Sequence, residues 1–133
     1  MKKNYDIGLL ILRVSLGALM LFHGAGKLQS GVSMIGDMLT DKGLPAFIAY
    51  GVIIGEVIAP VLMIIGFRTR IAAFIFAFNM VVAVAMAHAG DVFKLTEHGS
   101  WALELQGLYF FGGLALFFTG GGKFGVSSKN NWD

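Results

Sequence analysis

The chain contains no cysteine and only two prolines, and charged residues make up just 14% of its 133 positions. Without cysteine, disulfides, iron–sulfur clusters, thiolate metal sites and dithiol relays are excluded. The shortage of charge is equally informative, because about 25% of the residues of a soluble domain are charged. We therefore expect lipid, and not water, to surround most of the exterior.

Apolar residues and glycine dominate what is present. Hydrophobic residues make up 56% of the chain, 19 residues are glycine, and the mean hydropathy is +0.76. This combination is typical of closely packed membrane helices. Since the net charge is only +2 and the basic residues are scattered, the sequence predicts a lipid bilayer as a partner and no nucleic acid.

Four segments are long and apolar enough to cross a bilayer, which takes roughly 20 residues. The first is too long for a signal-peptide core and contains Arg13, so we expect it to persist as an uncleaved helix. Pro60 is expected to kink the second. The segments cover about residues 7–27, 44–66, 71–89 and 101–119. The expected fold class is all-α, an integral membrane four-helix bundle forming one domain over residues 1–133.

The connection between the first two segments has a helical pattern of its own. Apolar residues recur there at helical spacing among polar ones, at Val32, Ile35, Met38 and Leu39. This pattern predicts a short amphipathic helix lying on the membrane surface.

Polar side chains form a stripe on the first segment. Ionisable groups at bilayer depth cost about 2.5–3.5 kcal/mol each, so each needs a partner or a role. At about 100° per residue, Arg13, His23 and Lys27 share one face, which should point into the bundle. Gly17 and Gly24 flank this face and would let another backbone approach closely.

Two groupings of the intramembrane polar residues follow from their depths. Arg13 and Glu56 differ in depth by no more than about two helical turns, so we predict an intramembrane pair, either structural only or functional. His23, His88 and Glu104 all fall near the outer end of their helices, with Lys27 one turn above His23. We predict that these four line one cavity.

Structural interpretations of the same residues stay open. Both histidines could cap helices or lie at the interface. Asn79 and Gln106 are expected to form hydrogen bonds between helices, with Gln106 facing away from Glu104. No cluster with the spacing of metal ligands is present, so no metal site is predicted.

The ordered set of polar and glycine positions resembles the DoxX family of small four-helix membrane proteins. The resemblance rests on residues 12–17 (LRVSLG), Phe22-His23-Gly24 with Lys27-Leu28, Gly55-Glu56, the turn at residues 66–70, His88 and Glu104. One departure is the tail, where Ser127-Ser128-Lys129 lacks the acid that ends the family's glycine, aromatic and serine pattern.

The resemblance implies a bacterial or archaeal membrane protein in a redox setting, with links to quinones, thiols or oxidative stress. The favoured hypothesis is a quinone-linked oxidoreductase or a small subunit of one, and whether the chain itself is catalytic stays open. His23 and His88 would donate hydrogen bonds to the headgroup, Glu104 would accept a proton, and Lys27 would bind substrate. Because no cofactor motif is present, a flavin or iron–sulfur centre would belong to a partner redox protein.

Three other functions are compatible with the sequence. Haem held by His23 and His88 is less favoured, because nothing else in the sequence specifies haem. A small transporter could use Glu56, although Arg13 disfavours a path for cations. A non-catalytic assembly or scaffold subunit, alone or as a homo-oligomer, is the third alternative.

The distribution of Lys and Arg predicts the orientation in the inner membrane. The side that holds both termini has six basic residues (Lys2, Lys3, Arg68, Arg70, Lys123 and Lys129), against three on the other side (Lys27, Lys42 and Lys94). The excess places both termini in the cytoplasm.

A reporter fused after Asp133 should report the cytoplasm, and one inserted in residues 96–100 should report the external side. The opposite pattern would reverse the orientation.

Overall fold

The computed structural model describes residues 2–133, with only the backbone described for Val32, and its helices form an antiparallel bundle. α1 (Tyr5–Ser30) is followed by the short α2 (Val32–Asp41). The second long element, Ala46–Ile65, is a continuous rod that joins η1 (Ala46–Ile48), α3 (Ala49–Ile53), η2 (Ile54–Ile58) and α4 (Ala59–Ile65). α5 (Thr69–Ala87), η3 (Ala89–Asp91) and α6 (Glu104–Thr119) complete the chain.

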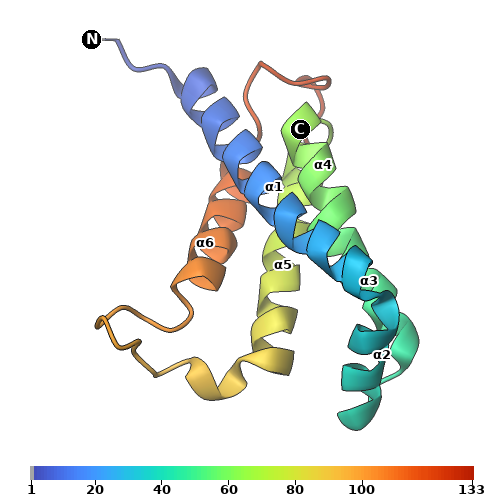
Figure 1. Cartoon of the computed structure of the whole chain (residues 1–133). Helices are drawn as coiled ribbons and strands as arrows, with labels where there is room; N and C mark the ends of the chain where they lie inside the picture. The colour runs from blue at the N-terminus through green and yellow to red at the C-terminus, as the bar shows by residue number, and fades with distance from the viewer. Residues whose placement is uncertain (1) are drawn as a thin grey trace.

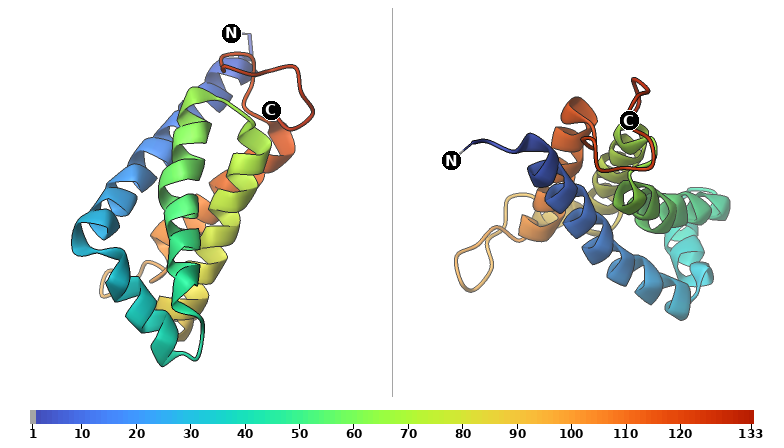
Figure 2. Two further views of the ribbon diagram at one scale, coloured as in Figure 1. Left: turned by 90° about the vertical axis from the view of Figure 1, so that its right-hand side faces the viewer. Right: turned by 90° about the horizontal axis from the view of Figure 1, so that it is seen from above.

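Figures 1 and 2 place both termini at one end of the bundle, with α2 and the connection between α5 and α6 at the other. Within residues 2–133, three helices are long and apolar enough to cross a membrane: α1, the Ala46–Ile65 rod and α5. The predicted all-α membrane bundle is therefore confirmed. The fourth helix, α6, has only 16 residues and packs against α5.

The fourth helix begins later than the sequence suggested. We predicted a helix from residue 101, but α6 starts at Glu104. Trp101 instead forms a β-bridge with Leu95, and the Ala102 N–H donates to the Lys94 carbonyl at 3.0 Å. The backbone groups of the residues ahead of α6 thus form hydrogen bonds within a tight loop and not within a helix.

The predicted amphipathic helix is present as α2. Leu39 is fully buried against the start of the rod, whereas Met34 is exposed. The side chain of Val32, part of the predicted pattern, lies outside the described residues.

A core of small and flexible side chains holds the four long elements together. Its buried members are Leu16, Met20, Ala59, Met63, Ala72, Ala73, Phe76, Met80, Tyr109 and Leu116. Large apolar side chains such as Phe22, Phe74 and Phe118 point outward and are more than half exposed. An apolar exterior around an apolar core is the arrangement expected of a protein solvated by lipid.

Glycine lets α1 lie directly on the rod, as predicted. A Cβ at Gly17 would lie 2.7 Å from the Pro60 carbonyl oxygen, and one at Gly24 would lie 2.5 Å from the Glu56 carbonyl oxygen. Pro60 has no N–H to offer the Glu56 carbonyl, and the residues just before it widen into the π-helical turn η2. The expected disturbance at Pro60 is therefore local.

Arg13 is bound by backbone carbonyls and not by Glu56, so the predicted pairing of these two residues is wrong. Arg13 is only 1% exposed. Its guanidinium donates to the backbone carbonyls of Met63 at 2.9 Å, Ile64 at 2.6 Å, Gly121 at 3.2 Å, and Phe124. The last carbonyls of a helix lack partners within the helix and carry its negative dipole end, so they attract a cation with several donors. Arg13 thereby joins the end of α4 to the C-terminal tail.

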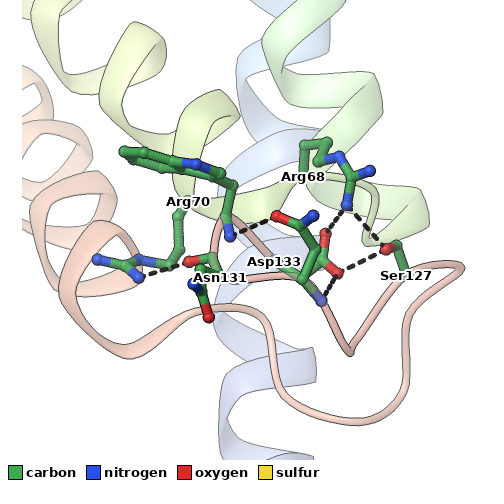
Figure 3. Close-up of polar contacts among 7 residues, drawn as sticks. Arg68, Arg70, Ser127, Asn131 and Asp133 are labelled. Atoms are coloured by element: carbon green, nitrogen blue, oxygen red, sulfur yellow. Dashed lines mark hydrogen bonds and ion pairs between the residues drawn. The ribbon is translucent and has the colours of Figure 1, made fainter.

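The C-terminal tail folds back over the end of the bundle that carries the termini (Figure 3). The Asp133 carboxylate accepts hydrogen bonds from Arg68 at 3.0 Å, Ser127 Oγ at 2.5 Å and the Asn130 N–H at 2.7 Å. Burial acts to raise the pKa of Asp133, but these hydrogen bonds and the Arg68 charge lower it to about 2. The acid that the sequence around Ser127 lacks is thus supplied by Asp133, which stays ionised at neutral pH.

Replacing Arg13 should release the tail. Arg13→Met keeps the bulk but removes four hydrogen bonds to carbonyls, and each bond to a charged group contributes roughly 1.5–3 kcal/mol. We expect a loss of about 3 kcal/mol or more in the free energy of unfolding in detergent, with faster proteolysis within residues 122–133. Lys129→Met, an exposed change in the same tail, is the control. Equal proteolysis of the two variants would contradict this role for Arg13.

Candidate functional site

A polar cavity of about 260 Å³ lies at the end of the bundle away from the termini. All four long elements contribute to its wall. The lining residues are Met20, His23, Lys27, Glu56, Met80, Ala83, His88, Leu105, Gln106 and Tyr109. The structure therefore brings together His23, His88 and Lys27, as the sequence suggested, and adds Glu56 to them.

Lys27 and Glu56 form the charged pair of this cavity. The Lys27 ammonium lies 2.5 Å from Glu56 Oε1, and the side chains are 40% and 3% exposed, respectively. Lys27 is three residues beyond Gly24, whose close contact with the rod brings the last turn of α1 to the level of Glu56. A lysine with a long apolar stem can reach a carboxylate there while its own end stays partly open.

Only one oxygen of Glu56 has its hydrogen bonds satisfied. Asn79 Nδ2 lies 3.4 Å from Oε1, the oxygen that Lys27 also contacts. Oε2 is buried, and no hydrogen-bond partner for it exists within residues 2–133. An orphaned buried polar atom is costly and calls for an explanation. Glu56 is among the residues that line the polar cavity, so a ligand there is a candidate hydrogen-bond partner for its carboxylate.

Glu56 lies in the π-helical turn η2, a rare element that occurs frequently at functional sites. Gly55, its neighbour, packs on Asn79, where a Cβ would lie 2.5 Å from the asparagine side chain. This contact holds α5 close to the rod. The hydrogen bond from Asn79 Nδ2 to Glu56 Oε1 confirms the prediction that Asn79 forms a hydrogen bond between helices.

The two histidines approach the cavity from different helices. The His23 ring meets Tyr109 edge to face, with 5.9 Å between the ring centroids, and Tyr109 in turn packs on Phe76. His88 follows the last residue of α5, and its Nδ1 lies 3.5 Å from the Asp91 carboxylate. A neighbouring carboxylate orients an imidazole ring.

Glu104 is not among the residues that line the cavity, contrary to our placement of it. It is the exposed first residue of α6, whereas Gln106 and Tyr109 line the wall. At about 100° per residue, Glu104 lies on the opposite face of the helix from these two. The prediction that Gln106 faces away from Glu104 is therefore correct, but the predicted inward face of the helix is wrong. The buried Tyr109, at helical spacing from Gln106 and Gly113, was the signal that could have identified it.

Comparison with known proteins gives this cavity a family context. The sequence model of the DoxX family matches residues 8–89, more than half of the chain. The chain belongs to the DoxX family. The matched region contains His23, Lys27, Glu56 and His88, and it ends before α6 and the tail.

Two curated relatives are similar in sequence. A Bacillus subtilis protein named "Putative oxidoreductase CatD" is 37% identical over 84 residues, which are 63% of this chain and 62% of that protein. An uncharacterized protein of Haemophilus influenzae is 32% identical over 125 residues, covering 91% of this chain and 89% of that protein. No solved structure matches the chain.

The Lys27–Glu56 pair should show an asymmetric response to mutation. Lys27→Met leaves a buried carboxylate without its cation and should cost roughly 2 kcal/mol, less than a fully buried pair because Lys27 is partly exposed. Glu56→Gln should cost less, since the freed ammonium can turn toward water. The double variant should be more stable than Lys27→Met alone, as measured by denaturation in detergent. Strict additivity of the two single changes would argue against the pair.

Proposed function

We propose that this DoxX-family chain is a quinone-binding membrane subunit of an oxidoreductase, with the polar cavity as its headgroup site. The observation that carries the proposal is the buried Glu56 Oε2, which has no hydrogen-bond partner among the described residues and belongs to a side chain that lines the cavity together with Lys27. The Bacillus relative is named "Putative oxidoreductase CatD", and this name supports the oxidoreductase class. The match spans 62% of that protein, so its activity is carried over only as part of this proposal.

The donor and acceptor set of the cavity fits a quinone headgroup. The two carbonyl oxygens of a quinone accept hydrogen bonds, which the imidazoles of His23 and His88 and the amide of Gln106 can donate. Tyr109 and Met20 supply apolar surface for the ring. The cavity, at about 260 Å³, is smaller than the roughly 300–1,000 Å³ of drug-sized sites, so it suits a single ring.

Bound here, a quinone would take up two electrons and two protons to become a quinol. Glu56 would hold a proton at Oε2, and Lys27 would offset the charge of the carboxylate after the proton leaves. His88, with Asp91 behind it, would serve as the second proton-carrying group near the mouth. This assignment gives Glu56 the proton-transfer role that sequence reasoning assigned to Glu104.

The electrons must come from another protein. The chain has no cysteine to ligate an iron–sulfur cluster, and its sequence carries no motif that binds a flavin. We propose a flavin or iron–sulfur protein as the electron donor, docked on the membrane subunit. With both termini in the cytoplasm of an inner-membrane protein, the cavity would open toward the outer leaflet.

Quinone binding can be tested on the purified protein in detergent. The two tryptophans, Trp101 near the cavity and Trp132 in the tail, provide a fluorescence signal that bound quinone should quench. We expect saturable quenching by ubiquinone-1 in the wild type, and quinone in the organic extract of protein purified from membranes. His23→Ala, His88→Ala, Gln106→Ala and Glu56→Gln should each raise the Kd by about tenfold, the loss of one good hydrogen bond.

Two matched controls are available in the exposed loop ahead of α6. His98→Ala and Glu97→Gln remove the same chemical groups from solvent-exposed positions and should leave the Kd within about twofold. Absence of saturable quenching in the wild type, with no quinone in the extract, would reject the proposal. Equal Kd values for the cavity variants and the controls would reject the cavity as the site.

A further inference from the structure

A second and larger cavity, of about 430 Å³, lies between the C-terminal half of α5 and the N-terminal half of α6. Its wall is apolar except for Gln106. Val81, Val84 and Ala85 line it from α5, and Phe110 and Phe111 line it from α6. We refer to it as the apolar slot.

Trp101 forms a fixed side of the apolar slot. Its indole N–H donates to the Val92 carbonyl at 2.7 Å, so the only polar group of the ring is used by the loop backbone. The ring rests on Gly107, where a Cβ would lie 2.7 Å from the indole. Because glycine permits this contact and the loop holds the ring, the indole presents an apolar surface to the slot.

The apolar slot and the polar cavity share part of their walls. Met80 and Gln106 line both. Methionine is unbranched and adapts easily to a neighbouring group. The two cavities are therefore adjacent at Met80 and Gln106, where a ligand with a polar ring and an apolar extension could span them.

We propose that the apolar slot binds the hydrocarbon side chain of the quinone whose headgroup occupies the polar cavity. This inference rests on the proposed function and deepens it, because it makes isoprenoid quinones, and not tailless ones, the substrate class. Neither cavity alone matches such a ligand. The polar one is too small, and the apolar one offers a headgroup only Gln106.

The inference is tested by comparing two quinones that share one ring. Ubiquinone-2 carries an isoprenoid side chain and ubiquinone-0 carries none, and Trp101 in the slot wall reports both by quenching. The wild type should bind ubiquinone-2 at least tenfold more tightly. Ala85→Phe, which fills the slot, should weaken ubiquinone-2 by about tenfold and change ubiquinone-0 by less than twofold, because burial of apolar surface drives binding of the side chain only.

Ala87→Phe is the matched control, since it makes the same change on the same helix at an exposed residue outside the slot wall. It should leave the affinities for both quinones unchanged. Because the isoprenoid side chain of ubiquinone-2 partitions into detergent equally with either variant, the comparison also removes this effect from the measured Kd. If Ala85→Phe does not fold, Val84→Phe fills the same slot from the neighbouring position.

The possible outcomes separate this inference from the proposed function. Equal affinity of Ala85→Phe and the wild type for ubiquinone-2 overturns the slot assignment while leaving headgroup binding intact. Loss of a co-purified phospholipid in Ala85→Phe, with quinone affinities unchanged, assigns the slot to a lipid acyl chain and also overturns it. Failure of the wild type to bind either quinone removes the proposed function itself.

Discussion

The close contact between α1 and the Ala46–Ile65 rod fixes the position of both intramembrane cations. Gly17 and Gly24 let the two backbones approach until a methyl group would clash with a carbonyl oxygen. One end of this contact carries Arg13 to the last carbonyls of α4, and the other end carries Lys27 to Glu56. If α1 moved away by the width of a side chain, both cations would lose these partners.

The buried charged groups at the two ends of this contact differ in how completely they are hydrogen-bonded. Arg13 has several hydrogen bonds to carbonyls and is enclosed by the tail, so it is satisfied within the protein. Glu56 is held by Lys27 and Asn79 through one oxygen only, and the cavity lies beside it. A structural residue would gain from completing its hydrogen bonds. The incomplete hydrogen bonding of Glu56 therefore favours a functional interpretation of the polar cavity. The complete hydrogen bonding of Arg13 favours a structural role for that residue.

The sequence supported the helices, the polar face of α1 and the glycine contacts, because these depend on periodicity and on residue type. It also grouped His23, His88 and Lys27, because depth can be counted from helix ends. The partner of Arg13 could not be inferred, since backbone carbonyls are present at every residue and only the fold shows which ones are free. Glu104 was misplaced because α6 is preceded by a tight loop, and on a helix that is apolar all round the hydrophobic residues do not mark the inward face. Only the spacing of Gln106, Tyr109 and Gly113 marks that face.

The short α6 has a consequence for how the protein sits in lipid. At about 1.5 Å per residue, α1 is roughly 39 Å long and α6 only about 24 Å, against a hydrocarbon thickness of about 30 Å. α1 is therefore longer than the hydrocarbon layer is thick, whereas α6 is shorter, and on the flank of α6 the bilayer must thin or the loop at residues 92–103 must enter it. This hydrophobic mismatch lies on the flank where α5 and α6 border the apolar slot. Bilayer thickness would consequently alter how readily a molecule dissolved in the lipid reaches the slot, with no change in any residue that lines it.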